Sequence, residues 1–328
     1  MKKVIVFTTG GTIAMKYDEA RGGLVPAVSG EDLAAAVPGL GSLARVEVRE
    51  FSNVASCNMS PQKMFELSLQ IESALADSEV AGAVITHGTD TLEETAYFLD
   101  LLHGSDKPVC VVGAMRGASD TSPDGPANIY CAVQTAASEN ARGKGVLVVL
   151  NNVIHAAGQV RKTHSANCAT FESPWWGPLG YCDQDRVIFR RAPVGRQVFH
   201  PRALTARVDL IPAQTGLGPE YIDFALSRGC QGIVIEGYGR GNIPPALEDG
   251  IARAAAQGVA VVIATRAFAG RPYETYAYPG SVGDSKKHGA VRGGEASGAK
   301  TRLKLMIVLS ERPELARDPA ALEKVMDS

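Results

Sequence analysis

Short apolar runs alternate with stretches of helical spacing along nearly the whole chain, and this alternation limits the fold more than any other feature. Several runs are continuously apolar and rich in β-branched residues, which is typical of strands buried on both faces of a parallel sheet. The predicted strands are 3–8, 45–51, 81–86, 108–112, 146–150, 207–211, 232–235, 259–264 and 303–309.

Helical patterns lie between these strands. Ser60 followed by Pro61 is an N-cap with proline at the first helical position, and it predicts a helix that continues to about residue 77. Asp90 stands three residues before Glu93, which is the spacing of a capping box with Asp90 as the cap. The other predicted helices are 95–103, 123–141, 220–228, 245–257 and 313–326.

Strands and helices in alternation predict an α/β fold with helices on both faces of the sheet. The segment 190–206 interrupts the pattern with charge, Pro193, Gly195 and Pro201. We therefore expect a larger N-terminal α/β domain over 1–189 with a mostly parallel sheet, a linker at 190–206, and a smaller C-terminal α/β domain over 207–328.

Composition excludes several classes of protein. The net charge is −2 from 33 basic and 35 acidic residues, so bulk charge gives no footprint for binding nucleic acid. No apolar run reaches the roughly 18 residues that a membrane helix needs. The apolar start of the chain breaks at residue 8, too early for a signal peptide. We therefore expect a cytoplasmic protein with neither a nucleic-acid nor a membrane partner.

The six cysteines are too sparse for a disulfide framework and include no Cys-x-x-Cys pair. The six histidines show none of the usual spacings of a zinc site. We expect reduced thiols and no metal ion or other cofactor.

Residues 8–12 (Thr-Thr-Gly-Gly-Thr) follow the first predicted strand directly. Paired glycines let a backbone turn sharply and bring N–H groups close to a ligand, and Thr12 then offers a hydroxyl at the strand's carboxyl end. A structural strand-exit turn accounts for the pattern equally well. A dinucleotide site does not fit, because the Gly-x-Gly-x-x-Gly spacing is absent.

Residues 86–91 (Thr-His-Gly-Thr-Asp-Thr) follow another buried strand. Capping a helix needs only Asp90, and the additional hydroxyl groups exceed that role. Strand ends that flank a switch point of a parallel sheet converge, so we expect Thr12, Thr89 and Asp90 on one cleft. His87 is interpreted as a structural hydrogen-bonding residue.

Lys162 taken alone is a solvated surface charge. Beside a carboxylate and a hydroxyl in a cleft, however, a neutral lysine amine can take a proton from threonine while Asp90 orients it. A Ser-His-Asp hydrolase is disfavoured, because no Gly-x-Ser-x-Gly elbow is present.

Taken together, residues 9–14 (Thr-Gly-Gly-Thr-Ile-Ala) and 86–91 resemble the two signatures of bacterial-type L-asparaginases and glutaminase-asparaginases. The similarity covers nearly the whole chain. It continues through residues 93–96, 113–116, 124–128, 169–171, 241–244 and 297–302.

This resemblance implies hydrolysis of the side-chain amide of L-asparagine to aspartate and ammonia, without a cofactor. It makes Thr12 the primary nucleophile and makes Thr89, Asp90 and Lys162 a second triad. Ser56 matches the residue that holds the substrate's α-carboxylate, and Asp90 also matches the acceptor for its α-amino group. Cys57 and Gly88 complete the implied substrate contacts.

Gly11 and Thr89 carry the candidate backbone N–H donors for the oxyanion. An acyl-Thr12 intermediate is the favoured mechanism, and attack by water activated by Thr89 and Lys162 is the rival. The family's assembly implies a homotetramer of intimate dimers whose C-terminal domains complete neighbouring sites. Asn242 matches a residue that reaches across, and a turn residue before Pro244 is the equal alternative.

Three positions depart from the family. Gly23 stands where relatives carry a loop tyrosine, so Tyr17 is the nearest candidate to assist Thr12. Cys57 replaces a glutamine that many relatives have beside the substrate serine. Residues 273–278 (Tyr-Glu-Thr-Tyr-Ala-Tyr) occupy the place of a specificity segment, although a surface turn is the simpler interpretation.

Two alternatives stay open at this point, and a third is disfavoured. A glutaminase-asparaginase shares every motif, and a non-catalytic small-molecule binding domain uses the same glycine turn. A tRNA-linked amidotransferase subunit shares the hydrolase core but normally carries an additional domain ahead of it.

Overall fold

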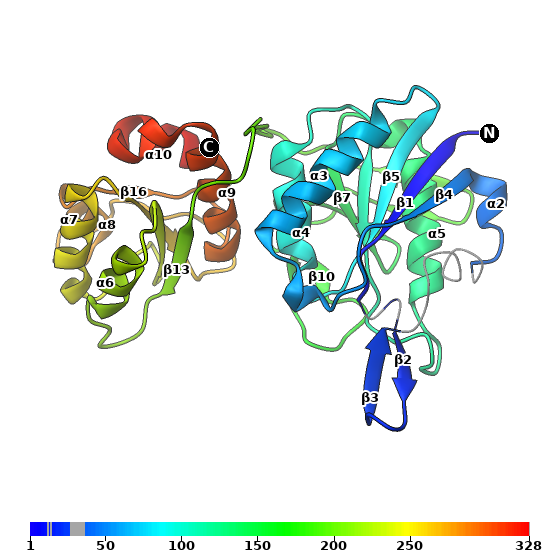
Figure 1. Ribbon diagram of the computed structural model, residues 1–328, viewed down its shortest axis with the longest axis horizontal. Helices are drawn as coiled ribbons and strands as arrows, with labels where there is room; N and C mark the ends of the chain where they lie inside the picture. Colours follow the sequence, from blue (N-terminus) through cyan, green and yellow to red (C-terminus); the bar gives the residue numbers. More distant parts are fainter. Residues whose placement is uncertain (12, 14, 27–36, 328) are drawn as a thin grey trace. The chain divides into compact units, whose positions relative to one another are not determined.

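The computed structural model describes residues 1–11, 13, 15–26 and 37–327, and for 15–18 and 23–26 it describes the backbone alone. Contacts divide the chain into two compact units, Met1–Val198 (unit 1) and Phe199–Ser328 (unit 2), each of them an α/β structure (Figure 1). The predicted α/β class is therefore confirmed, while the predicted domain bounds with a linker at 190–206 stay a prediction.

Unit 1 is built on an eight-stranded sheet in the order β12-β11-β8-β7-β6-β5-β1-β4. The central strands from β7 to β4 are parallel, and the edge strands β8, β11 and β12 are antiparallel. The strands are β1 (Lys3–Thr8), β4 (Arg45–Glu50), β5 (Val80–Thr86), β6 (Val109–Val112), β7 (Val146–Leu150), β8 (Val153–Ala156), β11 (Gly180–Asp183) and β12 (Arg186–Phe189).

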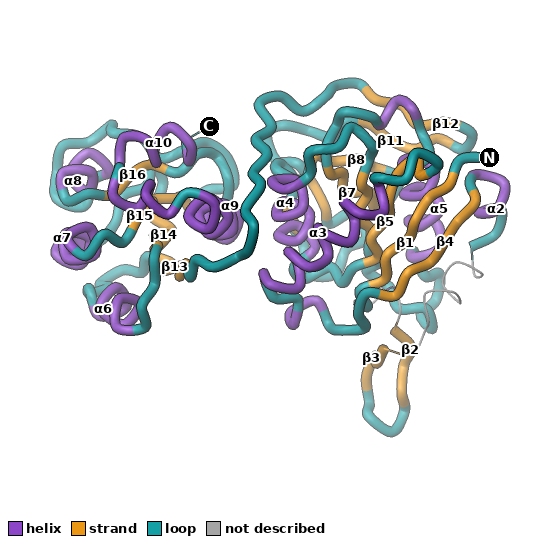
Figure 2. The backbone as a smooth tube through the Cα atoms, turned by 45° about the horizontal axis from the view of Figure 1, so that its top comes forward, coloured by secondary structure: helices purple, strands orange, loops and turns teal. Residues whose placement is uncertain are grey.

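Strand β1 lies between β4 and β5, as Figure 2 shows. From β1 the chain first adds β4 on one side, and it then adds β5, β6 and β7 in turn on the other. The carboxyl ends of β1 and β5 therefore flank the point where the winding reverses, which is where open α/β sheets place ligands. Thr8 of β1 is paired with Thr86 of β5 at this end.

Helices cover both faces of the sheet, as predicted. Val4 and Val6 of β1 belong to a buried cluster with α5, whereas Ile5 and Phe7 belong to a second cluster with α3 and α4. Alternate residues of β1 therefore pack into the hydrophobic cores on the two faces of the sheet, which explains the continuously apolar sequence of this strand. The helices of unit 1 are α2 (Leu40–Leu43), α3 (Pro61–Leu75), α4 (Leu92–Leu102) and α5 (Gly125–Ala136), with short 3-10 turns η2 (Ser56–Asn58) and η3 (Glu139–Ala141).

Two small ribbons complete unit 1. Strands β2 (Met15–Asp18) and β3 (Gly23–Pro26) form an antiparallel hairpin directly after the first glycine turn. Strands β9 (Arg161–Lys162) and β10 (Phe171–Glu172) form the second ribbon. These ribbons carry two residues singled out by the sequence, Tyr17 and Lys162.

Unit 2 holds a four-stranded parallel sheet in the order β13-β14-β15-β16. Its strands are β13 (Val208–Pro212), β14 (Gly232–Gly237), β15 (Ala260–Thr265) and β16 (Ala290–Arg292). Its helices are α6 (Glu220–Ser227), α7 (Glu248–Ala256), α8 (Val282–Lys287), α9 (Gly298–Glu311) and α10 (Pro319–Met326), with 3-10 turns η4 (Pro245–Leu247) and η5 (Pro313–Arg317).

The predicted strand at 303–309 is wrong, because this segment lies inside helix α9. Every residue from Leu303 to Leu309 is buried, including Lys304. A helix that is buried nearly all round shows no polar face, so its sequence cannot be told from a buried strand by periodicity.

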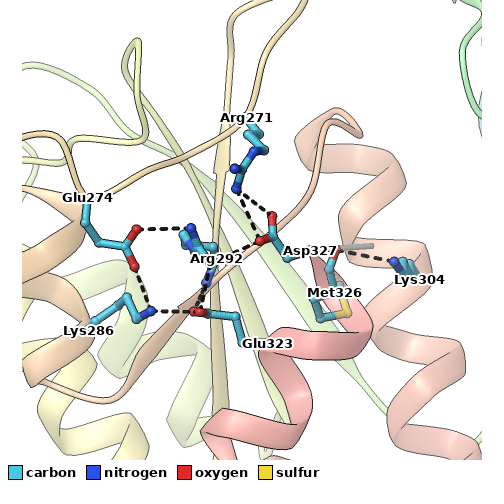
Figure 3. A network of polar contacts seen from close by, with 8 residues as sticks. All are labelled: Arg271, Glu274, Lys286, Arg292, Lys304, Glu323, Met326 and Asp327. Atoms are coloured by element: carbon cyan, nitrogen blue, oxygen red, sulfur yellow. Dashed lines mark hydrogen bonds and ion pairs between the residues drawn. The ribbon is translucent and has the colours of Figure 1, made fainter.

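A network of ion pairs ties the loop after β15 to α8, β16 and α10 in unit 2 (Figure 3). The Arg292 guanidinium lies 3.1 Å from carboxylate oxygens of Glu274, Glu323 and Asp327, and its side chain is 15% exposed. Lys286 Nζ lies 2.7 Å from oxygens of both glutamates. Partial burial raises the pKa of the Glu274 carboxyl, but the hydrogen bond from Lys286 and the positive charges of Lys286 and Arg292 together outweigh it, so the pKa lies below its ordinary value.

Within residues 1–11, 13, 15–26 and 37–327, none of the helices combines the length and apolar character that crossing a lipid bilayer requires.

Candidate active site

The first wall of the site is the turn after β1. Gly10 and Gly11 have φ values of +102° and +87°, a backbone region that side-chain-bearing residues rarely adopt. Thr9 anchors the turn, because its backbone N–H and its hydroxyl both donate to the carbonyl of Thr86, at 3.2 and 2.9 Å. Gly10 lies against the backbone of Val54, where an added Cβ would come within 2.5 Å of the carbonyl oxygen.

The second wall is the turn after β5, and it touches the first. A Cβ on Gly11 would stand 2.3 Å from both Cα and N of Gly88. The two glycine-bearing turns therefore meet backbone to backbone, although 77 positions separate Gly11 from Gly88 in the sequence. The predicted convergence of these strand ends is confirmed for the residues that the structure describes.

Ser56 forms the third wall, on the 3-10 turn η2. A Cβ on Gly88 would lie 2.7 Å from Ser56 Oγ, and the Thr91 hydroxyl donates to the Ser56 carbonyl at 2.7 Å. Ser56 itself is 5% exposed. The adjacent Cys57 is exposed, so this pair presents a buried hydroxyl next to an accessible thiol.

Lys162 brings an ammonium group to the second turn. Its Nζ donates to Thr89 Oγ1 at 3.0 Å and to Asp90 Oδ1 at 3.1 Å. The Lys162 side chain is 18% exposed and that of Asp90 is 70% exposed. An ion pair with a carboxylate as exposed as that of Asp90 adds little to stability. The contact between Lys162 Nζ and the Thr89 hydroxyl is therefore the feature that bears on chemistry.

Glu93 holds the backbone of Lys162 in place. Glu93 Oε2, on the first turn of α4, accepts the Lys162 backbone N–H at 2.5 Å, and Lys162 is also paired with Phe171 in the β9–β10 ribbon. Sequence reasoning does not identify Glu93 as a site residue. Its spacing, three residues after Asp90, is equally the signal of helix capping.

The capping prediction itself is wrong. The N-cap of α4 is Thr91, and no side chain makes a capping hydrogen bond there. Asp90 and Glu93 both direct their carboxylates toward Lys162 instead, as their hydrogen bonds show. These two residues, of types common at the start of a helix, therefore make hydrogen bonds to Lys162 on strand β9 instead of capping α4.

His87 is a structural hydrogen-bonding residue, as predicted. Its Nδ1 lies 2.8 Å from the Gly88 carbonyl oxygen, which can only accept, so Nδ1 carries the proton. Nε2 then accepts from the Thr95 hydroxyl at 3.0 Å. Burial lowers the pKa of the imidazole to about 4, which keeps the ring neutral near pH 7.

For three predicted site residues, a place in this cluster stays a prediction. Thr12 lies outside the described residues. Tyr17 is on strand β2, and its side chain is likewise outside the description. Asn242 belongs to unit 2, where its backbone bridges to Tyr238 in a tight turn.

Ile13, immediately after Thr12, is 2% exposed and packs near the start of α5. An added Cβ on Gly125 would lie 3.0 Å from Ile13 Cγ1. The chain just past the first turn is therefore held by the core on the side of α5.

One group of side chains in the described residues has the spacing of metal ligands. Ligand atoms of Glu248, Asp284 and His288 in unit 2 lie within 4.8 Å of one another. Gly280 N–H donates to Glu248 Oε1 at 2.5 Å, and Lys287 Nζ donates to Asp284 Oδ1 at 2.9 Å. The protein already supplies partners to both carboxylates, and we assign no ion to them.

Comparison with known families matches both units. Residues 3–195 match the family described as "Asparaginase, N-terminal", and residues 207–326 match "Glutaminase/Asparaginase C-terminal domain".

Individual relatives match over nearly their whole length. The chain is 38% identical over 317 residues to an L-asparaginase of Bacillus licheniformis, covering 97% of this chain and 98% of that one. It is 33% identical over 335 residues to a probable periplasmic L-asparaginase of Haemophilus influenzae, covering 100% and 93%. The crystal structure of a probable cytoplasmic L-asparaginase from Campylobacter jejuni superposes with a TM-score of 0.88 at 33% identity, covering 99% of each chain.

Proposed function

This chain belongs to the asparaginase family, and we propose that it is an amidohydrolase that converts L-asparagine to L-aspartate and ammonia. The observation that carries this proposal is the contact of Lys162 Nζ with both Thr89 Oγ1 and Asp90 Oδ1, beside the paired glycine turns. A hydroxyl, a carboxylate and an amine at one strand end are the groups that acyl transfer from a neutral amide requires.

In this mechanism the Thr12 hydroxyl oxygen attacks the amide carbon, the C–N bond breaks, and the amide nitrogen leaves as ammonia with the hydroxyl proton. Water then hydrolyses the resulting acyl-threonine ester to aspartate and free Thr12. Lys162, acting as its neutral amine, is the base: it takes the Thr12 proton through Thr89 and passes it to the leaving amide nitrogen. Asp90 orients Lys162 and accepts the substrate's α-amino group. The rival sequence, in which Thr89 and Lys162 activate water directly, predicts no ester and no burst of product.

Backbone N–H groups stabilise the oxyanion in this proposal. His87 Nδ1–H donates to the Gly88 carbonyl oxygen, so this carbonyl points toward the imidazole ring. Because a peptide is planar and trans, the N–H of Thr89 then points the opposite way. Together with the N–H of Gly11 it forms a pair of donors, each worth roughly 3 kcal/mol in characterised enzymes.

Substrate recognition falls to Ser56, Cys57, Gly88 and Asp90. The buried Ser56 hydroxyl binds the α-carboxylate of the substrate. Gly88 leaves space for the Ser56 hydroxyl, because a side chain at position 88 would collide with it. Exposed Cys57 lies beside the substrate's path and contributes to the choice between asparagine and glutamine. A one-methylene difference is worth about 1–3 kcal/mol, so one substitution at this position matters.

A glutaminase-asparaginase is the second candidate, because the C-terminal unit matches a family described by both activities. The ratio of kcat/KM for L-asparagine to that for L-glutamine separates the two. A ratio above about 100 corresponds to about 3 kcal/mol of discrimination and identifies an asparaginase.

The assembly and location are further parts of the proposal. We infer a cytoplasmic homotetramer of intimate dimers in which Asn242 of unit 2 completes the site of a neighbouring copy, and in which Tyr17 assists Thr12. Sedimentation of the full chain tests the tetramer. In mixtures of Thr12→Ala and Asn242→Ala chains, recovery of activity tests whether Asn242 acts across copies.

The direct test is ammonia release by Lys162→Met. We expect a loss of about 10²–10⁴-fold, the range for removal of a general base. Unfolding stability should change by less than about 1 kcal/mol, because the partner carboxylate is largely exposed.

Lys287→Met is the matched control, since it removes a lysine whose Nζ lies 2.9 Å from Asp284 Oδ1. That variant should keep wild-type turnover. Near-native turnover of Lys162→Met would reject the proposed role of the lysine.

A further inference from the structure

Unit 1 contains a second cluster of reactive side chains that the proposed reaction does not use. Cys131 on α5 and Cys182 on β11 come from elements that pack together, although 51 residues separate them. Both cysteines line a cavity of about 330 Å³, with Tyr130, Gln134 and Asn152 among the other lining residues. Holding one water molecule requires only about 10–15 Å³ of such volume, so this cavity has room for a small solute.

The two sulfurs are held by a shared set of contacts. Cys182 Sγ lies 3.5 Å from the Cys131 carbonyl oxygen and 3.4 Å from Thr135 Oγ1. Cys131 Sγ donates to Asn152 Oδ1 at 3.2 Å, while the Asn152 carbonyl accepts the Cys182 backbone N–H at 2.8 Å. Asn152 thus contacts both cysteines and fixes them beside each other.

The pair is chemically unequal. Contact with Cys131 lowers the pKa of the Cys182 thiol, and the same contact raises the pKa of the Cys131 thiol. Burial raises the pKa of the other two buried thiols, Cys110 and Cys230, in the described part of the chain. The thiolate is the reacting form of cysteine, so Cys182 is the more reactive thiol of the pair. Cys131 is then the resolving cysteine.

We propose that Cys131 and Cys182 form a peroxide-reactive dithiol that closes to a reversible disulfide between α5 and β11. In the first step the Cys182 thiolate attacks one oxygen of a hydroperoxide. The O–O bond breaks, an S–O bond forms, and hydroxide or alkoxide leaves, so Cys182 becomes a sulfenic acid.

In the second step the Cys131 sulfur attacks the sulfenic sulfur, which forms the S–S bond and releases water. Overall, two thiols and one hydrogen peroxide give one disulfide and two waters. Thr135 supports the first step, because its hydroxyl can turn from the Cys131 carbonyl to donate to the thiolate.

The experiment maps oxidised thiols in the full-length wild-type protein. Reduced protein is treated with equimolar hydrogen peroxide, the remaining thiols are blocked with N-ethylmaleimide, and the digest is examined by mass spectrometry. We expect a Cys131–Cys182 linked peptide that is lighter by two hydrogens and is lost on treatment with dithiothreitol. Absence of this peptide, with both cysteines still blocked by the maleimide, would overturn the proposal.

Three variants assign the order of the steps. Cys131→Ser should stop at a sulfenic acid on Cys182, which dimedone traps, and Cys182→Ser should leave Cys131 unlabelled. Cys230→Ser removes a buried thiol in unit 2 and should retain the crosslink. Dimedone on Cys131 in the Cys182→Ser variant would contradict the assigned order, and the wild-type map stands even if a variant fails to fold.

Discussion

Replacing Gly11 with alanine tests the contact on which the proposed site depends. At φ +87°, a Cβ adds about 1–2 kcal/mol of backbone strain. The same Cβ would stand 2.3 Å from two backbone atoms of Gly88, which cannot rotate aside as a side chain would. Overpacking of this kind adds about 1–3 kcal/mol, so we expect Gly11→Ala to lose about 2–5 kcal/mol of stability.

Gly143→Ala separates the two contributions. Gly143 has φ +68° and nothing within 4 Å of an added Cβ, so it carries the backbone strain without the collision. We expect it to lose about 1–2 kcal/mol and to keep full activity. Urea unfolding followed by far-UV circular dichroism measures both variants against the wild type.

Activity gives the sharper answer. The structure can relieve the collision only by moving the two turns apart, and a displacement near 1 Å lowers kcat/KM by about 10²-fold. A Gly11→Ala enzyme as stable as Gly143→Ala and as active as the wild type would refute the claim that these turns meet in one site.

Other outcomes follow from single contacts. Arg292→Met should destabilise the protein by about 3 kcal/mol in urea unfolding, because it removes a cation that pairs with all three carboxylates, whereas an unchanged midpoint would contradict the network's role. Ser60→Ala should lose about 1 kcal/mol through the cap on α3, and no loss would reject the cap as a stabilising contact. Burial lowers the pKa of His87, His103 and His155 to about 4 from 6.5, so the unfolded chain binds more protons between these values. Stability should therefore be complete above about pH 6.5 and fall toward pH 4, with a shallower slope in His103→Gln, and an equal slope in that variant would refute this assignment.

Most strands of the parallel sheets could be predicted closely, whereas the three-residue strand β16 is not predicted from the sequence. The predicted span 3–8 coincides with β1, and 146–150 coincides with β7. These strands are buried on both faces, so their apolar runs are unbroken and their ends are marked by glycine or polar residues. Such signals are local and need no knowledge of the partner strand.

The antiparallel edge of unit 1 was missed because its strands are short and only partly apolar. A signal was present nonetheless: Asn151 and Asn152 lie between β7 and β8 with φ values of +49° and +62°. Paired asparagines between apolar runs are typical of a two-residue hairpin turn. Helix α9, in contrast, is buried on nearly all sides, so its sequence lacks the alternation of apolar and polar residues that marks a helix.

The sequence by itself determined the two glycine turns, the hydroxyl groups beside them and the strands that they follow. Backbone conformation and apolar periodicity depend on residues that are close together in the sequence, so these features could be predicted locally. Only the tertiary structure decided which of these groups touch. Lys162 reaches Thr89 from 73 residues away, and Cys131 meets Cys182 across 51, through the pairing order of strands and the packing of helices on them. That order is a non-local property of the sheet, since each strand's neighbours depend on how the whole core is covered.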